Sequence, residues 1–419
     1  MFKNLKLIFS PKNKDIRKKI GFTLFGLLIF TLGTTIPVPG TKIPEIDGLW
    51  NLFNVIGGGA LQNFSIFALG VSPYISASII TGILQMDIIP YFSELKESGE
   101  QGRRKINQIN RYIGIVLAFL QGIAMAFTFM NGASTMEYIK IALILTAGTA
   151  FLLWLGDQIT QKGIGNGLSL FIMAGILNTI PHMFVECFTD LVIDRTGSLL
   201  IGIVGFIAFV LVYLLIIVGV VFEESSERRI PIQYSNRSSS AFSKSQNYIP
   251  FKLNSAGVMP VIFASVILTI PTFIAGLLGE ESSFTLFVNE YINYTTPTGF
   301  VLYIVLIFVF GFFYTNMQIN PKELAKNLNK SGGYIPGVRP GMETEKYIKK
   351  ILNRITFLGS TFIAIIAGIP IVFSSFINTG LPASVSIGGT GVLIVVGVAI
   401  ETYKQLESSL INRNYKGAR

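Results

Sequence analysis

Ten separate apolar stretches constrain this chain more than any other feature, because each is long enough to cross a lipid bilayer. A membrane-spanning helix needs about 17 to 25 mostly apolar residues. Stretches of this kind lie near residues 20–37, 72–90, 112–131, 138–156, 168–187, 199–222, 255–278, 299–318, 352–373 and 387–403. Only 13% of the 419 residues are charged, about half the share of soluble domains. The sequence therefore predicts an all-α, polytopic membrane protein.

The basic residues predict the orientation of these spans. Loops on the cytoplasmic side of a membrane carry an excess of Lys and Arg. If both termini are cytoplasmic, 30 of the 33 Lys and Arg residues fall on that side, and only Lys42, Lys140 and Arg195 fall on the other. The net charge of +10 is then a property of one membrane face, where anionic lipid attracts it. We expect no direct, sequence-specific binding of nucleic acid.

The composition argues against most kinds of catalytic site and metal-binding site. Cys187 is the only cysteine and His182 the only histidine, so the chain cannot form an internal disulfide or a cysteine metal cluster. Basic residues before the first span resemble the start of a signal peptide, but no small-x-small cleavage motif follows, so we interpret that span as retained. We expect no cofactor, no metal and no enzymatic activity of the chain's own.

The stretch from Val55 to Gly70 is apolar, too short to span the bilayer and rich in glycine. Irregular backbone persists at membrane depth only where protein buries it or a water-filled cavity adjoins it. We therefore expect a re-entrant segment, with an ordinary extracellular loop as the alternative. In the next helix Val71, Ile75 and Ile79 share one face. That stripe suits either a packing surface or a hydrophobic constriction.

The spans carry few ionisable residues. Asp157 and Glu401 lie near span ends, and no span centre holds an obvious charge. Ion-coupled carriers place ionisable residues at mid-membrane. This pattern favours a pore over the main alternative, a secondary transporter with broken helices. A purely structural anchor would need no re-entrant segment.

Two loops on the basic side are longer than connections require. In the loop 223–254, β-prone runs at 230–234 and 248–252 flank a serine-rich stretch and predict a hairpin. In the segment 319–354, prolines and glycines force a turn that carries Arg339 among lysines. A guanidinium on such a turn suits phosphate or carboxylate recognition. The alternative is a solvated basic loop that follows the positive-inside rule.

A series of motifs resembles the SecY family along nearly the whole chain. The motifs are Ile36–Gly40, Gly58–Leu61, Ser65–Gly70, Pro73–Ile80, Gly102–Ile106, Trp154–Thr160, Gly163–Gly167, Gly257–Ser265, Pro336–Gly341 and Gly388–Val396. The resemblance implies two pseudo-symmetric, inverted five-helix halves around an hourglass pore, with a re-entrant plug. It divides the chain into a cytoplasmic N-terminal segment (1–19), an N-terminal half (20–187, with the plug at about 52–69), a C-terminal half (188–403, with loops 223–254 and 319–351) and a cytoplasmic tail (404–419).

The resemblance also implies the function and its residues. The chain would be the protein-conducting channel subunit of a bacterial plasma-membrane translocon, in a housekeeping form or an accessory form devoted to a few substrates. The residues that match the family's positions are a pore ring of Val71, Ile75, Ile172, Ile262 and Ile394; a plug with Gly58, Gly59, Ala60, Leu61, Ser65 and Ile66; a lateral gate with Ser76, Ile79, Gln121 and Asn254; and partner-binding loops with Arg228, Arg229 and Arg339.

The implied partners are SecE, SecG, the SecA ATPase, the ribosome, signal peptides, nascent chains and membrane lipids. Two positions depart from the family pattern. Leu32 stands where many relatives carry arginine, and Gly82 stands where many carry glutamine. Both changes are expected to make the channel interior more apolar.

Overall fold

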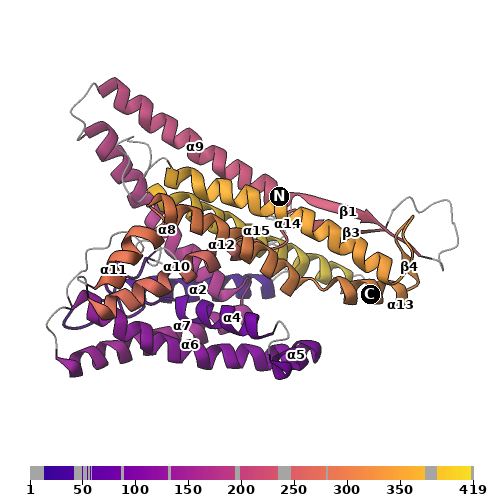
Figure 1. Cartoon of the computed structure of the whole chain (residues 1–419), viewed down its shortest axis with the longest axis horizontal. Coiled ribbons are helices and arrows are strands. Elements are labelled where there is room, and N and C mark those ends of the chain that lie inside the picture. Colours follow the sequence, from indigo (N-terminus) through magenta and orange to yellow (C-terminus); the bar gives the residue numbers. More distant parts are fainter. Residues whose placement is uncertain are drawn as a thin grey trace.

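The computed structural model describes residues 14–41, 50, 54, 57, 59–85, 89–130, 134–193, 199–234, 247–279, 282–372 and 385–416, and it is mostly helical (Figure 1). Each of the ten predicted spans overlaps one helix. These helices are α2 (Lys14–Thr34), α4 (Ser72–Leu84), α6 (Gly99–Phe129), α7 (Thr135–Lys162), α8 (Gly167–Phe188), α9 (Leu199–Ser225), α10 (Met259–Leu278), α12 (Pro297–Gln318), α14 (Met342–Ile371) and α15 (Val385–Lys416).

Seven of the described helices are long and apolar enough to cross a membrane, namely α6, α7, α8, α9, α10, α12 and α14. Helix α4 is apolar but shorter. The chain is therefore a multi-pass membrane protein, as predicted. The polar residues that the spans do contain often begin them: Ser134 and Glu137 form a reciprocal capping box at α7, and the Asn166 side chain accepts two backbone N–H groups at α8. Such caps matter where no water can pair with free backbone groups.

The first five and the last five of these helices repeat one pattern of neighbours. In the first half α4 packs on α6, α6 on α7, α7 on α8, and α2 on α8. In the second half α10 packs on α12, α12 on α14, α14 on α15, and α9 on α15. Helices α4, α6 and α7 lie along one side of the molecule and α9, α14 and α15 along the other (Figure 1). The halves meet where α10 contacts α4 and α6, and where α15 contacts α8.

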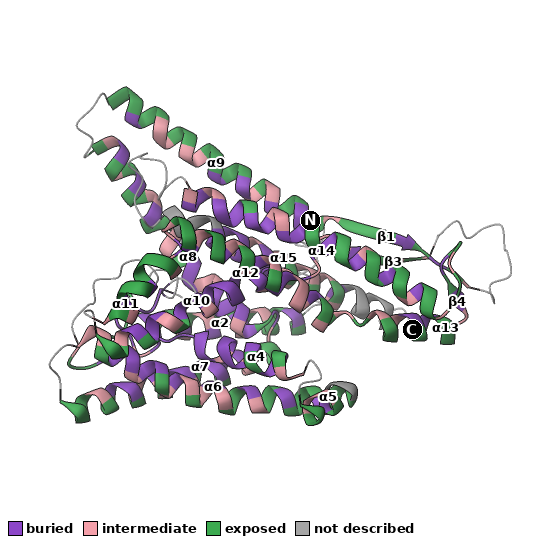
Figure 2. Cartoon of the chain, viewed as in Figure 1, coloured by how far each residue is buried: buried purple, intermediate pink, exposed green. Residues whose placement is uncertain are grey.

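The outer surface is apolar, as a lipid-facing surface must be. Helix α9 is exposed along most of its length (Figure 2), and only 17% of its most apolar window is buried. Its exposed side chains include Leu215, Val218 and Phe222, each of which keeps more than two thirds of its surface accessible. In water such a helix would cause aggregation, whereas in a bilayer it is stable.

The described part of the re-entrant segment is a series of turns buried inside the first half. Residues 59–70 contain no helix, and Gly59 and Gly70 adopt positive φ, which glycine tolerates best. The carbonyl of Ile66 packs directly against Gly148, which lies midway along α7. The segment therefore lies at the depth of a span centre, which fits the predicted re-entrant element better than an extracellular loop.

The loops 223–254 and 319–354 fold together into one unit. Strand β1 (Glu227–Pro231) pairs with β3 (Tyr248–Lys252), which confirms a hairpin in this loop, although its first strand begins three residues before the predicted run 230–234. Strand β2 (Gln233–Tyr234) pairs with β4 (Gly333–Tyr334) of the other loop. Helix α13 (Pro321–Lys330) and the start of α14 complete a small apolar core with Ile230, Phe251, Leu328, Ile335 and Ile348. We call this unit the loop module.

The loop module lies at one end of the bundle together with α5 (Pro90–Glu97), on the right in Figure 1. The start of α2 and the end of α15 lie at this end too, because Ile16, Ile164 and Leu410 form one apolar cluster beside the turn that joins α7 to α8. The described parts of the segments predicted to be cytoplasmic thus meet at one end, which we call the basic end. At the other end lie α11 (Ser283–Phe287) and the π-helices η2 (Thr189–Ile193) and η3 (Val288–Ile292).

Candidate functional site

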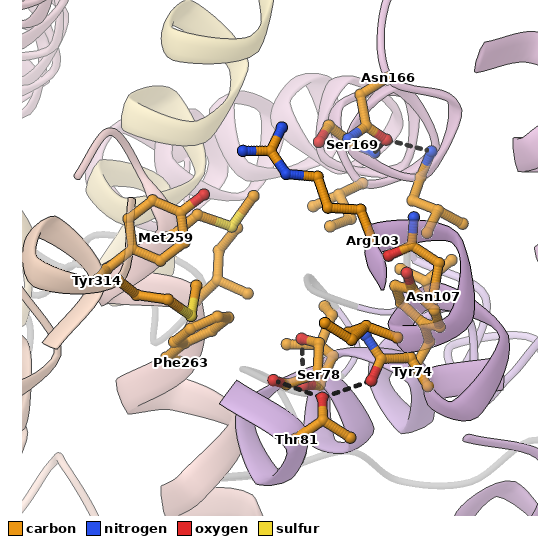
Figure 3. Close-up of a pocket in the computed structure, with 18 of the residues that line it drawn as sticks. Tyr74, Ser78, Thr81, Arg103, Asn107, Asn166, Ser169, Met259, Phe263 and Tyr314 are labelled. Carbon is orange, nitrogen blue, oxygen red and sulfur yellow. Dashed lines mark hydrogen bonds between the residues drawn. The ribbon is translucent and has the colours of Figure 1, made fainter. Parts of the chain in front are cut away.

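A cavity of about 360 Å³ opens between helices of both halves. Its walls come from α4, α6 and α8 of the first half and from α10 and α12 of the second (Figure 3). Four of the five residues predicted for the pore ring line it, namely Val71, Ile75, Ile172 and Ile262. The fifth, Ile394, belongs to the same buried apolar cluster as these four. The structure thus brings together residues that lie more than 300 positions apart in the sequence.

Local structure positions each of these aliphatic side chains. Val71 is the N-cap residue of α4 and Ile75 follows one turn later. Ile262 lies in the first turn of α10, two residues after Pro260, which suits the start of a helix. All five side chains are at least nine-tenths buried. Helices α4, α8 and α10 thus place aliphatic side chains at the cavity wall, and Ile394 of α15 belongs to the same buried cluster.

The remainder of the cavity wall combines apolar side chains, such as Met259 and Phe263, with polar ones and is almost uncharged (Figure 3). The polar side chains include Ser78, Thr81, Asn107, Asn110, Asn166 and Ser169. Among the described residues that line it, Arg103 is the only one with a charge. None of these polar side chains was predicted from the sequence as a site residue. One sequence pattern could have predicted part of this wall, because Arg103, Asn107 and Asn110 are spaced to lie on one face of a helix. The apolar stretch predicted for that span begins only at residue 112, so the three residues were assigned to a loop.

The predicted gate residues divide into two groups. Ser76 and Ile79 are buried on α4, and Ile79 joins the same apolar cluster as the ring. Gln121 lies on the stripe of α6 that also carries Ala124 and Thr128, and this stripe faces Gly276 of α10. The Oε1 atom of Gln121 is buried and has no hydrogen-bond partner among the described residues. These three side chains thus lie on α4 or α6, the helices that meet α10 where the two halves join.

Asn254 lies in a different environment. Its Nδ2 atom is 3.3 Å from carboxylate oxygens of both Glu223 and Glu224 and donates to the Gly257 carbonyl oxygen at 3.0 Å. Both glutamates end α9 and are almost completely buried. Helix α14 approaches closely at Gly359. Asn254 therefore joins α9 to the residues that lead into α10, inside the second half.

The two departures from the family pattern differ in position. Gly82 of α4 faces α12, where an added Cβ would lie 3.3 Å from both Phe313 and Met317. It therefore makes this contact between the halves apolar, as expected. Leu32 is 57% exposed and lines an outward groove between α2 and α7. The expectation that Leu32 makes the interior more apolar is wrong, because its side chain points out of the bundle.

The predicted plug residues lie largely in the described part of the first half. Ala60, Leu61 and Ser65 are fully buried, and Gly59 donates its N–H to the Asn54 carbonyl oxygen at 2.7 Å. The Asn54 side chain accepts the N–H groups of the residues at 61 and 62. Ile66 follows in the segment bonded to Ile36. Gly58 lies outside the described residues. Hydrogen bonds within the segment thus hold its shape, and the bond from Ile66 to Ile36 joins it to the residues that follow α2.

The three arginines predicted to bind partners are all exposed on the loop module. Arg228 and Arg229 lie on β1, and Arg229 stacks over Tyr248 of β3, with its guanidinium carbon 4.8 Å from the ring centroid. Arg339 lies in the turn between β4 and α14. Because β2 pairs with β4, the loops that carry these arginines form a single structural unit.

The fold and the cavity define the class: a multi-pass helical membrane protein with two similar halves and a cavity between them. The SecY family model matches residues 65–403. The chain is 46% identical to the protein translocase subunit SecY of Halalkalibacterium halodurans, over 100% of this chain and 99% of the relative. It is also 46% identical to SecY of Staphylococcus aureus, over 97% of each chain. The chain belongs to the SecY family.

Solved structures share the fold. One described as the structure of a protein conducting channel has a TM-score of 0.68 at 20% identity, over 94% of this chain and 92% of that one. Sec61 in the canine ribosome–channel complex has a TM-score of 0.65 at 20% identity, over the same shares. At this level of identity the likeness concerns the arrangement of helices.

Proposed function

We propose that this chain is the channel subunit of a protein translocase, through which unfolded secretory polypeptides cross the membrane and membrane segments leave sideways into lipid. One observation carries the proposal: aliphatic side chains of α4, α8 and α10, which come from both halves, line a nearly uncharged cavity. Short apolar side chains fit around many polypeptides without binding one strongly. They also hinder ions, because a dry apolar constriction is costly for a charge.

In this proposal Val71, Ile75, Ile172, Ile262 and Ile394 form the pore ring, and the segment around 52–69 is the plug. The lateral gate is the boundary of α4 and α6 with α10 and α12, with Ser76, Ile79 and Gln121 on its first side. We leave Asn254 out of the gate, since its hydrogen bonds keep it inside the second half. The halves correspond to residues 20–187 and 188–403, with 1–19 and 404–419 as terminal segments.

We further propose that the basic end faces the cytoplasm of a bacterium and that the membrane is its plasma membrane. The concentration of Lys and Arg in the segments that meet at this end supports the orientation, and the bacterial relatives support the membrane. The loop module would bind the SecA ATPase or the ribosome through Arg228, Arg229 and Arg339. SecA would hydrolyse the ATP, and SecE and SecG would complete the complex.

Crosslinking to a stalled secretory chain tests the conduction path. Single cysteines at Ile75 and Ile262, in a background with Cys187 replaced by alanine, should both crosslink to a cysteine in the stalled chain. Leu145 of α7 is a matched control. It is aliphatic and buried like the ring residues, but it belongs to a different apolar cluster from theirs. If the two ring positions crosslink no better than the Leu145 position, the proposed path is wrong.

A further inference from the structure

Helix α4 needs an external support that the proposed function does not explain. It has 13 residues, so it is about 20 Å long, whereas the apolar core of a bilayer is about 30 Å thick. It begins at Ser72 with no side-chain cap, and it carries Val71 at its start and Ile75 in its first turn. A short uncapped helix has little stability of its own. The ring residues that it carries are therefore only as fixed as the contacts that hold α4.

Those contacts converge on Asn110 of α6. The Thr81 hydroxyl, at the far end of α4, donates to Oδ1 of Asn110, and the Tyr74 side chain forms a hydrogen bond with Asn110 as well. Asn110 and Thr81 are both buried. One amide thus connects α6 to two points of α4 that are seven residues apart. Between them the backbones approach closely, since a Cβ on Gly114 would lie 3.3 Å from the Tyr74 Cα.

A second polar contact extends this connection to α7. The next residue along α6, Arg111, pairs with Asp157 of α7, with Nη2 and Oδ2 2.5 Å apart. In contrast, α4 meets the second half through α10 and through the apolar contact of Gly82 with Phe313 and Met317 of α12. The Thr81–Asn110 pair is buried, and such a pair is directional and costly to break, whereas the partly exposed Arg111–Asp157 pair contributes less. Helix α4 is therefore joined to α6 by a directional polar contact, while its contact with α12 is apolar.

We propose that Asn110 is a positioning residue for the pore ring: through Thr81 and Tyr74 it fixes α4, and so Val71 and Ile75, to the α6–α7 wall. This inference rests on the proposed function, in which these two side chains close the resting channel. When the gate opens, α4 moves with α6 and α7 as one body. Without Asn110 the helix shifts on α6, and the ring no longer closes fully.

Resting ion conductance of the purified translocase complex in planar bilayers tests the proposal. Asn110→Leu removes the acceptor at similar volume and should raise the conductance about tenfold, the factor expected from losing one or two buried hydrogen bonds. Asn110→Asp keeps an acceptor for the Thr81 hydroxyl and should leave the channel closed. Asn107→Leu is the matched control, because Asn107 lies on the same helix and lines the same cavity but is exposed. Thr81→Val should reproduce the leak without changing Asn110.

A reversible crosslink distinguishes positioning from general destabilisation. A Cβ on Gly114 would lie 3.7 Å from the Tyr74 Cβ, which suits a disulfide. In a Cys187→Ala background, Tyr74→Cys with Gly114→Cys should abolish the Asn110→Leu leak when oxidised and restore it when reduced.

Three results would overturn the inference: a closed Asn110→Leu channel, an equal leak from Asn107→Leu, or a leak that the disulfide does not change. Ile262→Ser separates this failure from that of the proposed function, because it disrupts the ring directly. If Ile262→Ser leaks and Asn110→Leu does not, only the role of Asn110 is wrong. If Ile262→Ser is also closed, the ring is wrong and the inference is wrong with it.

Discussion

Replacing Gly276 with alanine should loosen the contact between the two halves. A Cβ at this position of α10 would overlap the Thr128 hydroxyl oxygen on α6, while the Thr128 Cβ would be 3.4 Å away and the Ala124 carbonyl oxygen 3.7 Å away. The clash is therefore with one atom. That hydroxyl donates to the Ala124 carbonyl oxygen at 2.9 Å, so it cannot rotate away without losing a hydrogen bond. Gly276→Ala must either break this bond or push α10 away from α6.

The size of the effect follows from the cost of overpacking. An added methyl group in a closely packed contact costs about 1 to 3 kcal/mol. This cost exists only while α10 and α6 are in contact, so it raises the free energy of the closed gate and not that of the open one. The ratio of open to closed channels should increase about 5- to 150-fold.

Two measurements follow from this shift. The purified Gly276→Ala complex should conduct more ions at rest in planar bilayers, and cells that carry it should export a reporter whose signal peptide has a shortened apolar core. The double variant Gly276→Ala with Thr128→Ala should return both to near the parent values, because removing the hydroxyl leaves ordinary van der Waals distances. A single variant as closed as the parent, or a double variant that leaks as much as the single one, would refute the reasoning.

Three further outcomes are expected. Asn254→Ala leaves two buried carboxylates without their shared amide donor and should lower the free energy of unfolding in detergent by about 3 kcal/mol; an unchanged unfolding curve would contradict this. Gly148→Ala places a methyl group against the Ile66 carbonyl and should destabilise the protein by about 1 to 3 kcal/mol, whereas Gly21→Ala, which meets no atom within 4 Å, should not. Arg339→Glu should reduce SecA-driven export about tenfold with unchanged thermal stability; normal export would remove Arg339 from the partner surface.

The sequence predicted the spans well because a bilayer imposes one simple rule on them. It predicted the ends of the helices less well. Hydropathy shows which residues lie in the lipid, whereas a helix can continue beyond the membrane into water. Helix α6 begins at Gly99, α14 begins at Met342 and α15 continues to Lys416, each well outside the apolar stretch that revealed it. Charged residues are good helix formers in water. Helix α2 shows the opposite case, because it ends at Thr34, before the prolines at 37 and 39.

The site was less accessible to sequence reasoning than the spans. Spacing alone placed Val71 and Ile75 on one face, since both lie on the same helix. The other three ring residues came only from the family resemblance, because no local pattern reveals that distant helices converge. The pairing of Gln233 with Tyr334 is of the same kind: each strand has two residues, and the partners lie 101 positions apart. A segment this short carries no strand signal of its own.

The buried glutamates of α9 bear on the choice between a pore and a carrier. The absence of obvious charge at span centres favoured a pore, yet Glu223 and Glu224 are almost completely buried. Their position resolves the conflict. They lie at the last turns of α9, at the basic end, bonded to Asn254, and neither lines the cavity between the halves. A carrier needs its ionisable groups where the transported solute binds. These carboxylates instead anchor the base of the loop module to the bundle, so the cavity keeps the nearly uncharged wall that a passage for diverse polypeptides requires.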